Sequence, residues 1–235
     1  MKINITRNNS RGFFDYDWLK TFHTFSFSSY FNTNRMNFGK LRVLNDDTIS
    51  PAKGFGLHPH ENMEIITIPL SGELRHHDNG GHSQVIKTGD VQVMSAGTGI
   101  WHSEFNNSES EDVSLLQIWI FPKVVDVEPR YDQKTYDIKD RKNKLQLLVS
   151  PEQSNGNLWI NQDAWLSLTE LDSGKSINYN NHKSGNGIFV FAIDGEVYID
   201  GESIGKRDSI ELQGVDETSI KAVKDSEVLI IEVPL

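Results

Sequence analysis

Apolar residues along this chain either alternate with polar ones or stand together in short runs, and Gly, Asn, Asp and Ser separate the runs. A period of two is that of a β-strand with one buried face. Many short strands at this spacing are typical of a β-sandwich or barrel, so the pattern predicts an all-β fold. The first runs lie at 41–44, 64–70, 72–77, 90–94, 114–121 and 144–149, and further runs follow residue 160.

One short segment has a pattern that suits a helix. Residues 15–22 read DYDWLKTF, in which the apolar side chains are spaced as on one helical face. Asp15 or Asp17 stands where an N-cap belongs. We therefore expect a turn or two of helix there.

The stretch from Pro122 to Asn143 differs from its surroundings, because it is richer in charge and contains prolines. Such composition is typical of a connection between domains. We expect a first domain at 1–122, a linker at 123–143 and a second domain at 144–235.

The two halves share a short sequence around a Gly-Glu pair, which indicates an internal duplication. The sequence LSGEL at 70–74 is echoed by IDGEV at 193–197. The histidines are not shared, since all but His182 precede residue 103. We therefore expect chemistry in the first half and a structural, degenerate second half.

Bulk charge and composition exclude several functions. The net charge of −10 opposes direct binding to nucleic acid. The chain has no cysteine, so a metal site must use His and carboxylate side chains. Its start has no apolar core like that of a signal peptide, and no stretch approaches the roughly 20 apolar residues of a membrane span. We expect a cytoplasmic protein with no membrane contact.

The candidate chemistry lies in two pairs of residues. His58 and His60 are two positions apart, as are His102 and Glu104, and residues at i and i+2 of a strand share a face. Neighbouring strands would bring all four together. Three imidazoles and a carboxylate suit iron, nickel, copper, cobalt, manganese or zinc and leave coordination positions open.

Residues around these pairs have more ordinary expected roles. Trp101 alternates with the candidate ligands, so we expect it to face away from the metal. Phe55 and Met63 flank the histidine pair and could line an apolar cavity. The nearby His76, His77 and His82 surround a turn sequence, DNGG, and we expect them to be solvated turn residues. We expect Trp119 and Trp159 in core or inter-domain packing.

The motifs resemble those of the pirin family, especially its bacterial members of the quercetin-dioxygenase type. HPHENME followed by SGE, and then KTGDVQVMSAGTGIWHSEFN, carry the resemblance. WLKTFHTFSFSSYF, GKLRVLNDD and LLQIWIFP with PRYDQK extend it over nearly the whole chain, more weakly after residue 150. The resemblance implies two cupin barrels, of the double-stranded β-helix or jelly-roll kind, in one chain.

The fourth metal ligand has two candidates. The general cupin pattern is met by His58, His60, Glu64 and Gly72, and then by Gly89, Gly97, His102 and Asn106, although Ser95 replaces a proline. In most cupins the first-motif glutamate, here Glu64, is the fourth ligand. Resemblance to pirins favours Glu104, which we expect, with Glu64 as the alternative.

The resemblance also implies an activity. It implies one divalent transition-metal ion, with iron as first choice, and cleavage of quercetin or a related flavonol with O2, in which Glu104 accepts the hydroxyl proton. The rival hypothesis is a metal-binding regulatory module that acts through protein partners, as a transcription co-regulator or a modulator of a metabolic enzyme. A third is another metal-assisted reaction on a small acid, since one fold hosts many chemistries.

Overall fold

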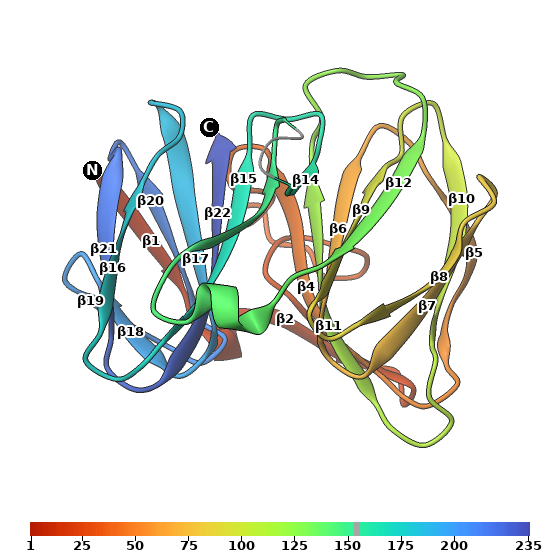
Figure 1. Cartoon of the computed structure of the whole chain (residues 1–235), viewed down its shortest axis with the longest axis horizontal. Coiled ribbons are helices and arrows are strands. Elements are labelled where there is room, and N and C mark those ends of the chain that lie inside the picture. The colour runs from red at the N-terminus through yellow and green to blue at the C-terminus, as the bar shows by residue number, and fades with distance from the viewer. Residues whose placement is uncertain (153–155) are drawn as a thin grey trace.

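Two β-barrels stand side by side in the computed structural model, which describes residues 1–152 and 156–235 (Figure 1). Each barrel is built from one seven-stranded and one four-stranded sheet. Helix is limited to two short 3-10 turns, η1 (Asn8–Ser10) and η2 (Ile138–Arg141), in the described part of the chain. The predicted all-β fold of two cupin barrels is confirmed.

The first barrel is formed by consecutive strands of the N-terminal half. Its large sheet has the order β12-β9-β6-β11-β4-β3-β2, and its small sheet the order β5-β10-β7-β8. The strands are β2 (Gly12–Asp15), β3 (Leu19–His23), β4 (Leu41–Ile49), β5 (Gly54–His60), β6 (Glu64–Ser71), β7 (Glu73–Asp78), β8 (Ser83–Lys87), β9 (Asp90–Ser95), β10 (Ile100–Asn106), β11 (Val113–Ile120) and β12 (Arg130–Thr135).

The second barrel repeats this arrangement. Its sheets have the orders β1-β20-β17-β22-β15-β13-β14 and β16-β21-β18-β19, which correspond to those of the first barrel except that β14 runs parallel to β13, whereas β2 runs antiparallel to β3. The strands are β1 (Lys2–Thr6), β13 (Gln146–Ser150), β14 (Leu158–Trp159), β15 (Trp165–Leu171), β16 (Ser176–Asn180), β17 (Asn186–Asp194), β18 (Glu196–Ile199), β19 (Glu202–Gly205), β20 (Ser209–Gln213), β21 (Glu217–Ala222) and β22 (Ser226–Pro234).

Strand alternation divides each large sheet into two buried faces. On β6, Ile66 and Ile68 belong to a core cluster shared with Phe189 and Ile231 of the second barrel, whereas Ile65 faces the interior of its own barrel. The two large sheets therefore pack face to face. A sheet buried on both sides requires near-continuous apolar strands, which explains runs such as IFVFAI and EVLIIEV.

Two segments link the barrels differently from the expected division. Strand β12 and η2 lie inside the expected linker at 123–143, and β12 pairs with β9 of the first barrel. Strand β1, from the N-terminus, pairs with β20 of the second barrel. The boundaries at 1–122 and 144–235 stay a prediction.

The helix expected at 15–22 is wrong. Asp15 ends β2, and its carboxylate accepts a hydrogen bond from the backbone N–H of Asp17, whose φ is +67°. This is an Asx turn with a left-handed residue, so the aspartates close a hairpin between β2 and β3 instead of capping a helix. No helix in the described residues is long and apolar enough to cross a membrane.

Candidate metal centre

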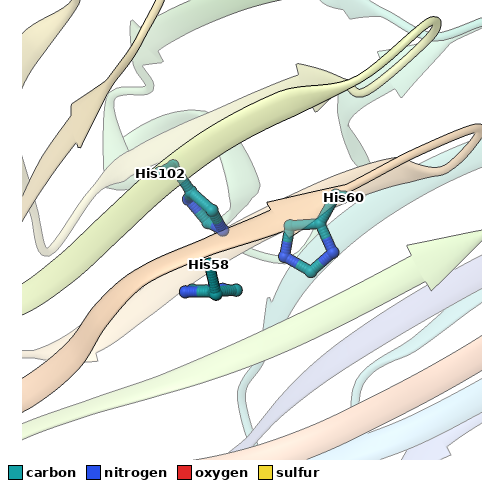
Figure 2. Close-up of side chains that lie close together, drawn as sticks. All are labelled: His58, His60 and His102. Atoms are coloured by element: carbon teal, nitrogen blue, oxygen red, sulfur yellow. The ribbon is translucent and has the colours of Figure 1, made fainter.

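Three imidazoles converge inside the first barrel. His58 and His60 lie on β5, and His102 lies directly opposite His58 on the antiparallel neighbour β10. Their ring centroids are 4.3 Å apart for His58 and His102 and 4.9 Å for each other pair. Figure 2 shows the three rings close together, with His102 on one strand and His58 and His60 on its neighbour. The strand periodicity that predicted this cluster is the reason for its geometry.

A β-bulge aims His58 into this cluster. Gly56 and Leu57 of β5 together oppose Ser103 of β10, which shifts the register between the two strands. The carbonyl oxygen of Gly56 lies 2.8 Å from Nδ1 of His58 and accepts its hydrogen bond. Nε2 of His58 is then the nitrogen with a free lone pair, as a metal ligand requires.

Burial keeps His60 and His102 in the neutral form. Burial, together with the neighbouring rings, lowers the pKa of His102 to about 2 and that of His60 to about 4. Neither ring nitrogen of His102 has a hydrogen-bond partner among the described residues. Neutral imidazole is the form that coordinates a metal, and a buried nitrogen without a partner gains most from a cation.

Glu104 lies next to His102 along β10 and is held in place by one amide. Gln117 on β11 donates from Nε2 to both carboxylate oxygens, at 3.1 and 3.0 Å. Burial raises the pKa of Glu104 to about 7, against the effect of this hydrogen bond. A nearby divalent cation would reverse that rise, because it favours the charged carboxylate. The donor set thus fits such an ion.

The atoms form two overlapping groups. One nitrogen from each of His58, His60 and His102 lies within 4.8 Å of the others, and one ligand atom from each of His76, His102 and Glu104 does the same. His102 belongs to both groups. Glu104 therefore shares a group with His102 and His76, and His102 connects it to His58 and His60.

His76 is the residue that sequence reasoning missed, and the solvated role expected for it is wrong. It is fully buried on β7, directly opposite Glu104. Its Nε2 donates to Asp78 at 2.9 Å, and Nδ1 of His82 lies 3.0 Å from the same carboxylate. The alternation from the buried Leu74 to His76 and Asp78 was the signal available in the sequence. His77 points outward, as a turn residue would.

Glu64, the alternative ligand, lies elsewhere. It shares the face of β6 that packs against the second barrel. Its carboxylate accepts hydrogen bonds from Ser95 at 2.7 Å and from Asn161 at 3.2 Å. The fold therefore does not bring it to the three histidines.

A cavity of about 790 Å3 opens beside the candidate ligands. Aromatic side chains line much of it, among them Tyr16, Trp18, Phe27, Phe55 and Trp119. The expectation for Phe55 holds, whereas Met63 is not among the lining residues and packs with Ile65. Trp119 lies 4.8 Å from the ring of His60, so it is a cavity residue as well as a packing residue. Trp101 is 47% exposed and faces outward as predicted.

The second barrel is filled where the first is open. Its strands β16 and β21, the counterparts of β5 and β10, contribute Tyr179, Ile177 and Ile220 to an apolar cluster. His182 is hydrogen-bonded to the buried Glu232, at 3.0 Å, and this carboxylate also accepts from the hydroxyl of Tyr179. Residues 156–235 contribute no member to the metal-ligand groups of the described chain.

Both halves of the sequence match family models. Residues 4–120 match the family described as Pirin, and residues 147–233 match the family described as quercetinase C-terminal cupin domain. The two matches fall on the two barrels.

Similar proteins span the same length. Quercetin 2,3-dioxygenase of Escherichia coli K12 is 38% identical, with 99% of each chain covered, and a pirin-like protein of Caulobacter vibrioides is 39% identical over 93% of this chain and 94% of its own. The crystal structure of the bacterial pirin YhhW of Escherichia coli in complex with nickel(II) superposes with a TM-score of 0.94, at 37% identity and 99% coverage of both chains.

Proposed function

The chain belongs to the pirin family, and on that premise we propose that it is a metal-dependent dioxygenase that opens quercetin or a related flavonol with O2. The observation that carries the proposal is one cavity that combines imidazoles, a buried carboxyl group and aromatic walls. Its volume of about 790 Å3 lies in the range of sites for small molecules. The Escherichia coli relative named quercetin 2,3-dioxygenase supports the same substrate class.

The proposed ligands are His58, His60, His102 and Glu104. A divalent transition metal bound to them would supply Lewis acidity toward the adjacent oxygens of a flavonol. Iron is our first candidate, and nickel, copper, cobalt, manganese and zinc fit the same donor set. Nickel is the ion named with the related bacterial pirin.

Glu104 is the proposed general base. Its buried carboxylate lines the cavity beside the imidazoles, where the metal-binding hydroxyl of a flavonol would enter. Gln117 fixes both carboxylate oxygens, so the group that accepts the hydroxyl proton of the entering flavonol is already oriented.

The aromatic walls hold the substrate and exclude water. Trp18 meets Phe55 edge-on at 5.3 Å, and Phe27 meets Trp119 edge-on at 5.2 Å. Planar rings of a flavonol find apolar contact with such walls. Exclusion of water strengthens the interaction of the substrate anion with charged groups around it.

Oxygen uptake with quercetin tests this proposal. The protein is stripped of metal, reloaded separately with iron, manganese, cobalt, nickel and copper, and compared with Glu104→Ala treated in the same way. We expect uptake that requires both a metal and Glu104. Uptake no faster than with free metal for every loaded form would contradict it and would favour the regulatory role through protein partners. The cytoplasmic location stays a prediction.

A further inference from the structure

The cavity has a polar side that the proposed chemistry does not use. Thr21 and His23 of β3 and Asn45 and Asp47 of β4 line it, and we name these four residues the polar wall. They belong to the large sheet of the first barrel, whereas the three candidate imidazoles belong to the small sheet that faces it. Asn45 lies directly opposite Gln117, the residue that holds Glu104, so the polar wall continues from the candidate ligands along the large sheet.

Strand register fixes the layout of the polar wall. Thr21 lies directly opposite Asp47, and His23 lies directly opposite Asn45, in the antiparallel pair β3–β4. Alternation sends the intervening Asp46 to the other face of the sheet, where Arg11 donates to its carboxylate at 3.1 Å. The wall is thus two cross-strand pairs of polar groups on a rigid sheet.

The polar wall is buried and is only partly satisfied by hydrogen bonds within the protein. All four side chains are less than a tenth exposed, and one polar atom of each has no hydrogen-bond partner among residues 1–152 and 156–235. The atoms are Oγ1 of Thr21, Nδ1 of His23, Oδ1 of Asn45 and Oδ1 of Asp47. An unpaired buried group costs the fold about 1–3 kcal/mol. Such groups that persist on a cavity wall are typical of binding residues.

The chemistry of these atoms identifies their ligand. The amide oxygen of Asn45 accepts hydrogen bonds, and burial raises the pKa of Asp47 to about 7, so the carboxyl group of Asp47 accepts hydrogen bonds and, when protonated, donates one. Phenolic hydroxyl groups both donate and accept hydrogen bonds, so a planar aromatic substrate that carries several of them matches these atoms. Trp18 and Phe55 on one side, and Phe27 on another, leave the rings of that substrate in apolar surroundings.

We propose that the polar wall binds phenolic hydroxyl groups of the flavonol that do not bind the metal, with Asp47 and Asn45 as their hydrogen-bond partners. This inference rests on the proposed function and deepens it, because it makes polyhydroxylated flavonols the preferred class. A flavonol that carries only the metal-binding pair of oxygens leaves the wall unpaired. A site built for hydroxyl groups discriminates strongly against ligands that lack them.

The test compares two ligands and two neighbouring aspartates. Binding of quercetin and of 3-hydroxyflavone, which has only the metal-binding oxygens, is measured by fluorescence quenching with metal-loaded protein under argon, so that no turnover occurs. Asp47→Leu removes an acceptor of the wall. Asp46→Asn is the matched control, since it alters the adjacent carboxylate on the opposite face.

We expect Asp47→Leu to weaken quercetin binding by about tenfold, the usual effect of losing a buried hydrogen bond. Binding of 3-hydroxyflavone should change by less than about twofold on the same scale. Asp46→Asn should leave both affinities as they are. The melting temperature of Asp47→Leu should equal or exceed that of the wild type, because an unpaired buried polar group is replaced by an apolar one. Asn45→Leu provides a second variant with the same expected pattern.

Two results would overturn the inference. The first is equal affinity of the wild type for quercetin and 3-hydroxyflavone. The second is that Asp47→Leu and Asn45→Leu each weaken the binding of both flavonols by the same factor, as general damage to the cavity would. Oxygen uptake separates this inference from the proposed function. If Asp47→Leu abolishes the preference for quercetin, the role of the polar wall is supported even when neither flavonol is cleaved. If both flavonols are cleaved and KM is unchanged in Asp47→Leu, only the proposed function is supported.

Discussion

His102 is the residue at which the two groups of candidate ligands meet. It contacts His58 and His60 from β5 and lies between them and His76 from β7. Burial lowers its pKa to about 2, so the imidazole enters the site without a proton to displace. A metal held by the proposed set needs His58 and His60, whereas a metal held by the second group needs His76.

His58→Ala and His76→Gln separate these arrangements, and His102→Ala removes a ligand that both share. We expect His102→Ala and His58→Ala to lower metal affinity by more than about a hundredfold, beyond the roughly 10- to 100-fold typical of lost outer partners. His76→Gln should retain the metal, with at most that smaller loss. Metal content after dialysis, measured by mass spectrometry, checks this. Full metal in His58→Ala with loss in His76→Gln would reverse the assignment.

Glu104 and Glu64 form a matched pair of buried glutamates. Glu104→Gln keeps the shape of the side chain but removes the base, so we expect kcat to fall by about 10²–10⁴-fold. Glu64→Gln should keep both metal content and kcat, because Glu64 faces the second barrel. Steady-state kinetics with quercetin checks this, and a large loss of kcat confined to Glu64→Gln would restore the alternative ligand.

The sequence predicted the candidate ligands but not the rest of the cavity. Two neighbouring strands each carry a pair of candidate ligands at positions i and i+2, namely His58 and His60 on β5 and His102 and Glu104 on β10. This spacing places each pair on one face of its strand. Asp47 sits between polar neighbours in LRVLNDDTI, and nothing local tells which of two adjacent aspartates faces a cavity. That choice depends on the packing of β4 against a second sheet.

Glycine turns set the register of the strands that carry the site. Gly72 joins β6 to β7 with a φ of +77°, and Gly195 joins β17 to β18 with a φ of +82°. The repeated Gly-Glu pair is therefore a repeated turn between two strands, and this turn was predictable from the sequence. The hairpin at Asp17 was not, because an aspartate before an apolar run suits a helix cap and an Asx turn equally well.

Gly72→Ala tests the turn that precedes β7. A Cβ at Gly72 would lie 2.8 Å from the carbonyl oxygen of Asp112, in addition to the strain of its positive φ. We expect a loss of about 1–2 kcal/mol from the left-handed backbone alone, with more from the clash. Gly174→Ala is the control, since its φ is +81° and its Cβ would meet open space. The free energy of unfolding of both variants is measured in urea. Equal losses in Gly72→Ala and Gly174→Ala would show that the clash with Asp112 does not contribute to the loss of stability.

At the scale of the molecule, the second barrel supports the first. The outer faces of the two large sheets form one apolar core, and β1 ties the N-terminus to the second barrel. The interior of the second barrel is filled by an apolar cluster, whereas the first barrel has the cavity at the imidazoles. The sequence predicted two barrels of which only the first carries candidate chemistry. It did not predict that β1 pairs with β20 of the second barrel, because this pairing joins segments far apart in the chain and no local pattern encodes it.

Phe189 tests this shared core. It is fully buried on β17 and packs against Phe25 and Phe38 from the first barrel, at centroid distances of 6.0 and 6.2 Å. We expect Phe189→Ala to lower the free energy of unfolding by about 3–5 kcal/mol, as for other buried aromatic residues. The metal content of the folded protein should stay unchanged. A loss below about 1 kcal/mol, measured by denaturant unfolding, would show that the barrels are stabilised independently.

The measurement that tests the central claim most directly is the fate of labelled oxygen. Iron-loaded protein is given quercetin under ¹⁸O2, and the products are analysed by mass spectrometry beside Glu104→Ala and free iron. If the protein is a dioxygenase, the products contain two labelled oxygen atoms for each flavonol cleaved, and the rate of cleavage depends on Glu104. Products that contain one labelled atom or none, or label that appears equally without the protein, would contradict the account.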